Sequence, residues 1–295
     1  MSLVVNHNMM AMNAARNLNI SYGRLAKSTE RLSSGLRINR SADDAAGLAI
    51  RELMRAEIAG MNQGIRNAND AISLIQTADG ALQVIDEKLI RMKELAEQAA
   101  TGSYNSDQRL MIESEYQQMA SEITRIANAT DFNGIKLIDG TLSGAHDGSQ
   151  LKSTGELKIH FGTGNDSAED YYYIKIGGAT ASFLGVGNQS NMDAGYTVST
   201  QQAAQESLDA INQAIISKDK IRAHLGAMQN RLENTVTNLG IMAENLQAAE
   251  SRISDVDVAT EMTEFVRNQI LTQAAVAMLS QANSLPQMAM QLIQG

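Results

Sequence analysis

Histidines and cysteines are the side chains of this chain best suited to holding a metal, and the sequence offers few of them. The four histidines are His7, His146, His160 and His224, and no two have the i, i+4 spacing that would place both on one helix face. There is no cysteine, which excludes a thiolate metal site, a cysteine nucleophile and a disulfide. We therefore expect neither a metal nor a cofactor.

Three further motifs have both a chemical and a structural interpretation. Adjacent aspartates at 43–44 could be paired catalytic carboxylates, but next to a helical pattern they are better explained as helix-start residues. The string DFNG at 131–134 resembles part of a calcium loop but lacks the terminal glutamate, so a turn is expected. The glycine pairs at 162–164 and 185–187 lack the third glycine of a dinucleotide loop. No nucleophile or triad pattern is present, and we predict that the chain is not an enzyme.

The composition favours long helices. The 295 residues include one proline, no tryptophan and four phenylalanines, while 43% are apolar. Proline interrupts helices, so its near absence permits long uninterrupted ones. The net charge of −9 comes without a basic stripe for a polyanion. No run of 18 apolar residues predicts a membrane span, and the first residues lack the pattern of a signal peptide.

Apolar residues recur four and three residues apart, the spacing of one helix face. One such pattern covers residues 11–36 and is expected to end near Ser34–Gly35, with Ser41 offering the next N-cap. Residues 43–100 would form a second helix about 87 Å long, broken at Thr101–Gly102.

A shorter helix should end before the turn at 131–134, and helical spacing returns at Thr200. The last apolar pattern contains Pro286, which should kink or end its helix. Residues 141–199 differ, because they are rich in Gly, Ser, Thr, Asp and Asn. Within them, Leu157–Phe161 and Tyr171–Ile176 are predicted to form a β-hairpin.

The predicted fold is therefore mainly α, a long antiparallel helical bundle or coiled coil with a small β-hairpin-containing insert. The two terminal helices each show one apolar stripe, and a two-helix hairpin is a poor core by itself. We expect these stripes to contact other subunits. The residues assigned to this assembly seam are Leu18, Tyr22, Leu25, Leu32, Leu36, Leu271, Met278, Leu285 and Leu292.

Several strings are more specific than the periodicity. Residues 32–39 read LSSGLRIN and residues 42–50 read ADDAAGLAI, which closely resembles the N-terminal core of bacterial flagellins. At the other end, AESRISD at 249–255 and QILTQA at 269–274 resemble the C-terminal core of the same family. The resemblance covers roughly residues 1–140 and 200–295.

The resemblance implies a filament subunit that polymerises helically for swimming motility. In the family, the two termini are disordered in the monomer and form an inner coiled-coil tube on assembly, around which a rod domain lies. The implied division is an inner-core helix at 1–42, the N-terminal part of the rod at 43–140, a β-rich insert without a large outer domain at 141–199, the C-terminal part of the rod at 200–254 and a second inner-core helix at 255–295.

The partners implied by the resemblance are further copies of the chain, the flagellar type III export apparatus, an export chaperone, the filament cap and the hook-associated proteins. The implied location is extracellular, in the flagellum, reached without a cleaved signal peptide. Host Toll-like receptor 5 is implied as well, since residues 89–96 align with the segment that it reads. The residues assigned to this receptor or lateral subunit contact are Leu89, Arg91, Glu94, Leu95 and Glu115.

Three alternatives remain open on the sequence. The chain could be a flagellin-like hook–filament junction protein, which shares both terminal cores. It could be a filament-borne enzyme, although the insert has no metal-ligand constellation. It could also be a cytoplasmic coiled-coil adaptor. The close match through residues 43–140 favours the filament subunit.

Overall fold

The structure is a computed structural model that describes residues 8–149, 154–167, 169–187 and 196–294. The side chains of residues 285, 289–290 and 292–294 fall outside the described part. The chain divides into two compact units, one made of Met1–Ile58 with Glu244–Gly295 and the other of Ala59–Ala243. Each unit is described by itself below.

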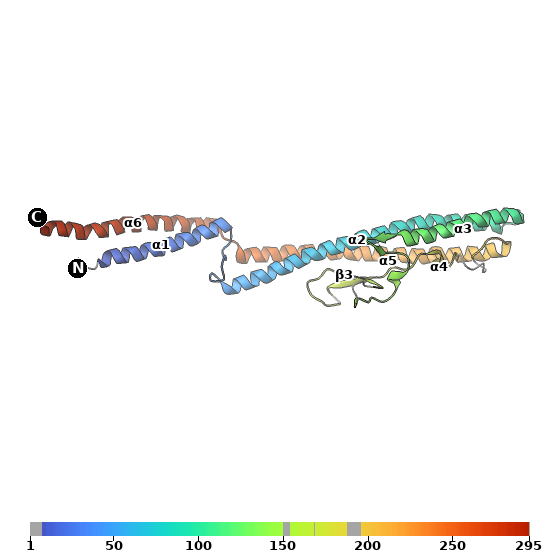
Figure 1. Ribbon diagram of the computed structural model, residues 1–295, viewed down its shortest axis with the longest axis horizontal. Helices are drawn as coiled ribbons and strands as arrows, with labels where there is room; N and C mark the ends of the chain where they lie inside the picture. The colour runs from blue at the N-terminus through green and yellow to red at the C-terminus, as the bar shows by residue number, and fades with distance from the viewer. Residues whose placement is uncertain (1–7, 150–153, 168, 188–195, 295) are drawn as a thin grey trace. The chain divides into compact units, whose positions relative to one another are not determined.

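In the first unit, helix α1 (Met9–Ser34) packs antiparallel to helix α6 (Val258–Gln294) (Figure 1). The side chain of Asn8 caps α1 by accepting a hydrogen bond from the backbone N–H of Ala11. Gly35 ends α1 in the left-handed conformation, with φ of 72°, which a residue without Cβ adopts readily. The predicted end at Ser34–Gly35 is confirmed.

Two details of the first unit differ from the expectation. Helix α2 (Ala45–Ala100) begins after Asp44, whose carboxylate accepts from the N–H of Gly47, so Asp44 rather than Ser41 caps it. Pro286 was expected to kink or end the last helix, yet α6 continues through it to Gln294. The prediction that Pro286 could end this helix is wrong.

In the second unit, helix α2 from Ala59 onward packs with α3 (Ser106–Ala129) and α5 (Gln201–Ser254) around a common apolar core. Asn105 and Gln108 form a capping box that starts α3 after the predicted break. Lys218 contacts Asp86. Arg222, one turn later on α5, contacts Asp79, about two turns earlier on α2. The order of these two pairs shows that α2 and α5 run antiparallel. The mainly helical fold predicted from the sequence is confirmed.

The insert contains the predicted hairpin. Strand β3 (Leu157–His160) pairs antiparallel with β4 (Tyr171–Ile174), so that Leu157 lies opposite Ile174. The strands are one and two residues shorter than expected. The turn at 131–134 joins two short strands, β1 (Asp131–Phe132) and β2 (Ile135–Lys136), as a turn rather than a calcium loop. A single turn of 3-10 helix, η1 (Thr141–Ser143), and a short helix, α4 (Ala181–Leu184), complete the insert.

Glycine lets the hairpin lie close to α2. A Cβ added at Gly64 would meet the carbonyl oxygen of Phe161 at 1.9 Å, and one at Gly60 would meet the side chain of Thr163 at 2.7 Å. One turn from Gly64, the amide of Asn67 donates to the carbonyl of His160 at 2.8 Å. The hairpin is therefore held against α2 by a close backbone approach that no larger residue permits at Gly64.

Candidate functional site

The side chains that are fully buried on α1 and α6 are mostly polar. Among the described side chains of α1 and α6, the buried ones are 4–9% exposed and only one of them is apolar. They are Ser28 from α1 with Glu261, Asn268, Thr272 and Ala282 from α6. Large apolar side chains such as Leu18, Leu25 and Phe265 are only half-buried, so part of their apolar surface remains available to another molecule.

The predicted assembly seam is only partly covered within the chain. Leu18, Leu25, Leu32 and Leu36 are half-buried. The remaining described members of the seam, Tyr22, Leu271 and Met278, are 44–62% exposed. Leu285 and Leu292 were predicted too, but their side chains lie outside the described part of the chain.

A second apolar stripe on α6 was not predicted from the sequence. Val258, Met262, Val266 and Ile270 are 44–59% exposed. Their four-residue spacing places them along one side of the helix, away from the buried side that faces α1. The signal was present in the sequence as this i, i+4 series, which lies just before the pattern that begins at Leu271.

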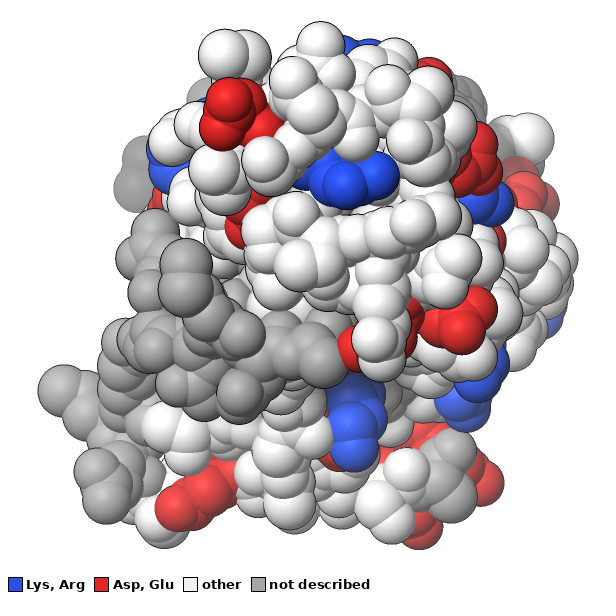
Figure 2. All heavy atoms as spheres, turned by 90° about the vertical axis from the view of Figure 1, so that its right-hand side faces the viewer, with Lys and Arg blue, Asp and Glu red and all other residues white. Residues whose placement is uncertain are grey.

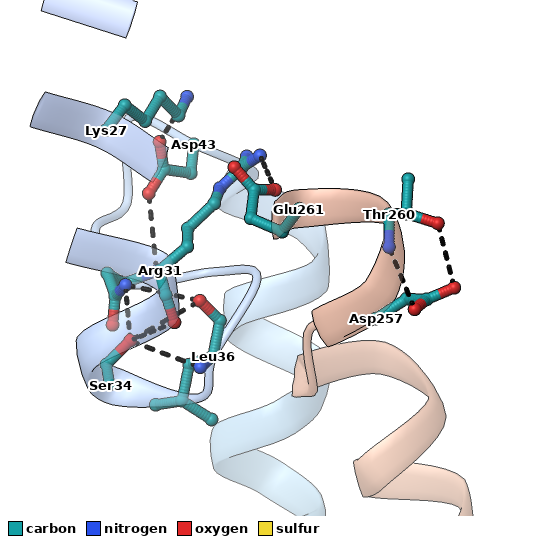
Figure 3. A network of polar contacts seen from close by, with 9 residues as sticks. Lys27, Arg31, Ser34, Leu36, Asp43, Asp257, Thr260 and Glu261 are labelled. Carbon is teal, nitrogen blue, oxygen red and sulfur yellow. Dashed lines mark hydrogen bonds and ion pairs between the residues drawn. The ribbon is translucent and has the colours of Figure 1, made fainter. Parts of the chain in front are cut away.

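A polar network holds the connection between α1 and the start of α2 (Figure 3). Lys27 forms an ion pair of 2.7 Å with Asp43, and the backbone N–H groups of Asn39 and Arg40 donate to the same carboxylate. Chiefly because Lys27 donates to it, the pKa of Asp43 lies below its usual value. The carboxylate is thus held ionised at the point where the chain leaves α1.

Two further contacts join this connection to the C-terminal half of the first unit. Arg31 pairs with Glu261 at 3.3 Å, and Leu36 forms a β-bridge with Asp255. Asp257 caps α6 by accepting from the backbone N–H and the hydroxyl of Thr260, and these bonds lower its pKa (Figure 3). Polar contacts therefore hold the segment that follows α1 close to the start of α6.

On the second unit, Arg91 joins α2 to α3. Its guanidinium donates twice to Glu115, at 2.8 and 2.9 Å, and once to Glu94, at 2.9 Å. These carboxylates raise the pKa of Arg91 above its already high value. The three charged side chains are exposed, whereas Leu89 and Leu95 are buried in the core. Of the five predicted contact residues, only the charged three can reach another molecule.

A groove of about 980 Å³ lies between the hairpin and α5. Arg231 stacks on the ring of Tyr172, 3.5 Å from its centre, at one wall. Asp170 is fixed by the backbone N–H groups of Gly164 and Asp166, which lower its pKa. Among the residues that the structure describes, the lining contains no histidine or serine, and no three possible metal ligands cluster. The groove therefore carries no evident catalytic arrangement.

The charges on the visible surface are mixed. Figure 2 shows basic and acidic atoms scattered among uncharged ones, without a broad patch of either sign on the face that it presents. Among the helices that the structure describes, none is both long and apolar enough to cross a membrane.

The chain matches two family models, the bacterial flagellin N-terminal helical region over residues 5–143 and the bacterial flagellin C-terminal helical region over residues 208–293. It is 43% identical to a flagellin of Halalkalibacterium halodurans over 99% of this chain and 100% of that protein. It is 42% identical to flagellin FlaB2 of Treponema pallidum, again over 99% and 100%.

A solved structure of a putative flagellar hook-associated protein from Vibrio parahaemolyticus is also similar, with a TM-score of 0.55 and 15% identity. The similarity covers 72% of this chain and 100% of that one. At this identity the likeness shows a shared fold and nothing more.

Proposed function

Because this chain belongs to the bacterial flagellin family, whose members are structural and non-enzymatic subunits of the flagellar filament, we propose that exposed apolar stripes on its terminal helices join one copy to the next. The observation that carries this proposal is the exposed stripe of Val258, Met262, Val266 and Ile270, on a different side of α6 from the residues that the helix buries. Removing apolar side chains from water lowers the free energy, so a second copy that covers them is bound more stably.

The four side chains are 44–59% exposed, so covering them removes only about half of their surface from water. Each then contributes about half of the ~1.5–3 kcal/mol of a fully buried side chain, before costs. Ordering the helices and fixing the orientation of the subunits offset part of that gain. A contact between different surfaces of identical copies that does not close on itself produces a helical filament.

The test is to charge the stripe without disturbing the α1–α6 contact. The variant Met262→Asp/Val266→Asp should remain helical but fail to form filaments in sedimentation and electron microscopy. The matched control is Met262→Leu/Val266→Ile, which changes the same two positions but keeps both of them apolar. The control should polymerise as the parent does. Filaments of the double variant at the parental protein concentration would refute the proposal.

We also propose the division into inner-core and rod parts that the resemblance to flagellins implies. Residues 1–42 and 255–295 supply the inner core, residues 43–140 and 200–254 the rod, and residues 141–199 the outer face of the rod. The seam residues of α1 and α6 then contact neighbouring copies in the inner core. In support, Tyr22, Leu271 and Met278 are exposed in the single chain.

The family resemblance supports a place outside the cell, after passage through the flagellar export apparatus with the help of an export chaperone. The filament cap and the hook-associated proteins are the further partners of this proposal. Detection of the intact chain in filaments sheared from cells, with its N-terminus uncleaved, is the expected result. Recovery of the chain only from the cytoplasm would contradict it.

A second surface role is supported by Arg91, Glu94 and Glu115, which form an exposed charged group on the second unit. This group would contact a neighbouring subunit or host Toll-like receptor 5. Exposed ion pairs contribute about 1 kcal/mol or less to stability. Arg91→Glu should therefore leave Tm almost unchanged. It should reduce either the signalling that the monomer elicits from the receptor or the ability of the chain to polymerise. If both are unchanged in the variant, this surface has neither role.

A further inference from the structure

A single lysine interrupts an otherwise apolar series on α5. Every seventh residue from Ala204 to Leu239 is buried, and all but one are apolar. The series is Ala204, Ile211, Lys218, Leu225, Leu232 and Leu239. Lys218 is 1% exposed, so its charge lies where each neighbour in the series places an apolar side chain.

The charge of Lys218 is paired across to α2. Its Nζ lies 2.5 Å from a carboxylate oxygen of Asp86 and 2.8 Å from one of Asp219, which is on α5 itself. A buried ion pair seldom adds net stability over well-packed apolar residues, because both charges lose water. Another contribution is needed to explain why a lysine occupies this position.

The apolar core leaves the alignment of α2 and α5 ambiguous. Helix α2 carries two buried seven-residue series of its own, and each consists only of apolar residues. They are Ala68, Ile75, Leu82, Leu89 and Ala96, and Ala71, Ala78, Ile85, Met92 and Ala99. Sliding α5 by seven residues, about 10 Å, would place apolar positions against apolar positions again. Charge is therefore what distinguishes these alignments.

We propose that Lys218 and Asp86 select the alignment of α2 against α5. In the observed alignment Lys218 meets Asp86 and Arg222 meets Asp79. A slide in one direction would bring Lys218 to Asp79 but leave Asp86 facing an apolar residue. A slide in the other would bring Lys218 to Lys93. A single polar residue at a buried seven-residue position fixes register in this way at some cost in stability.

The alignment has a consequence for assembly, which rests on the proposed function. Helix α2 carries Arg91, while α5 forms one wall of the groove beside the hairpin. A fixed alignment of α2 and α5 keeps these two surfaces at one constant distance from each other along the helices. A mixture of alignments would give several such distances and would disturb a helical polymer, in which every subunit makes the same contacts.

The test measures the alignment directly. The chain has no cysteine, so Gln83→Cys and Thr237→Cys give two unique spin-label sites at exposed positions of α2 and α5. Gln83 is about one turn from Asp86, which contacts Lys218, whereas Thr237 lies about five turns along α5 from Lys218. The line between the two labels therefore runs nearly along the helices, and a slide of α5 changes the distance between the labels by most of its length. Pulsed electron paramagnetic resonance on the dilute full chain should give one distance for the parent.

The variant that removes the pair is Lys218→Met/Asp86→Met, which keeps the core apolar. We expect a second distance, displaced by up to about 10 Å, together with an unchanged or raised Tm. The matched control is Arg222→Met/Asp79→Met, because this second pair joins the same helices but is 32% and 39% exposed. The control should keep a single distance. One unchanged distance in the Lys218/Asp86 variant, or a second distance in the control, overturns the proposal.

Two further measurements separate this proposal from the proposed function. Asp86→Ala should lower Tm by about 5 °C or more, because it leaves the buried Lys218 without its α2 partner. An unchanged Tm would count against the pairing. Filaments of the Lys218/Asp86 variant should be fewer or irregular in micrographs. If even the parent forms no filaments, the proposed function fails, while the distance measurement still decides the alignment.

Discussion

The side-chain amide of Asn8 donates a hydrogen bond of 2.7 Å to the carbonyl oxygen of Ala282. In a regular helix that carbonyl would accept from the N–H four residues later, but residue 286 is proline and has none. Asn8 also caps α1 through its side-chain oxygen. One side chain thus starts one helix and satisfies the group that proline leaves unpaired in another.

A double-mutant cycle should show this relationship. Asn8→Asp keeps the capping oxygen but removes the amide donor, so we expect it to cost about 1 kcal/mol or more of unfolding free energy. Pro286→Ala restores an N–H that can reach Ala282, so in that background the cost of Asn8→Asp should nearly disappear. Urea unfolding of the four proteins measures the coupling. Equal costs in both backgrounds would show that the Asn8 amide does not compensate for the proline.

The glycines of α2 should respond in opposite directions to the same substitution. Gly64→Ala forces a Cβ into the carbonyl of Phe161, and we expect a loss of about 2 kcal/mol or more with displacement of the hairpin. At Gly80 an added Cβ has nothing within 4 Å, so Gly80→Ala should stabilise the helix by about 0.5–1 kcal/mol. Thermal unfolding followed by circular dichroism distinguishes the two. Similar effects at both sites would contradict the close approach of the hairpin.

Acid should weaken the first unit. The pKa values of Asp43 and Asp257 are lower in the folded chain than their usual value of 3.8. The unfolded chain therefore takes up protons first, so stability is fully present above about pH 5 and is lost as the pH falls through the lowered values. Tm measured between pH 6 and pH 2 should decrease on acidification, and Asp43→Asn should flatten that dependence. An Asn variant with the full parental pH dependence would exclude a contribution from Asp43.

Removing residues 271–295 should separate folding from assembly. The deletion takes away the end of α6, including Leu271, Met278 and Ala282, but none of the second unit. We expect a soluble helical protein that forms no filaments under conditions in which the full chain polymerises. Sedimentation and electron microscopy provide the readout, with the second unit followed by its thermal unfolding. Normal filaments from the shortened chain would show that the end of α6 is not needed.

The sequence predicted the helices well because their signals are local. Seven-residue apolar spacing, the glycine at Gly35 and the break at Thr101–Gly102 act within a few residues of themselves, and the structure places the helix ends there. The hairpin around residues 162–170 was found for the same reason. The start of α2 was missed by a few residues, because Asp44 rather than Ser41 accepts the capping bond.

The candidate surfaces were harder to predict, because exposure depends on what covers a residue. The resemblance to flagellins grouped Leu89 and Leu95 with Arg91 as one contact segment, but the structure buries both leucines and leaves the arginine exposed. The seam predicted on α6 included Leu271 and Met278, while the exposed stripe from Val258 to Ile270 was missed.

The sequence by itself determined that this chain forms long helices with apolar faces, and its strings alone carry the resemblance to flagellins. Only the tertiary structure decided which face each helix buries, that the described side chains fully buried on α1 and α6 are mostly polar, and that Asn8 donates to the carbonyl left unpaired by Pro286. It also placed Lys218 against Asp86. The physical reason is that these contacts join residues more than a hundred positions apart, and a periodic apolar pattern shows that a face will be covered without showing what covers it.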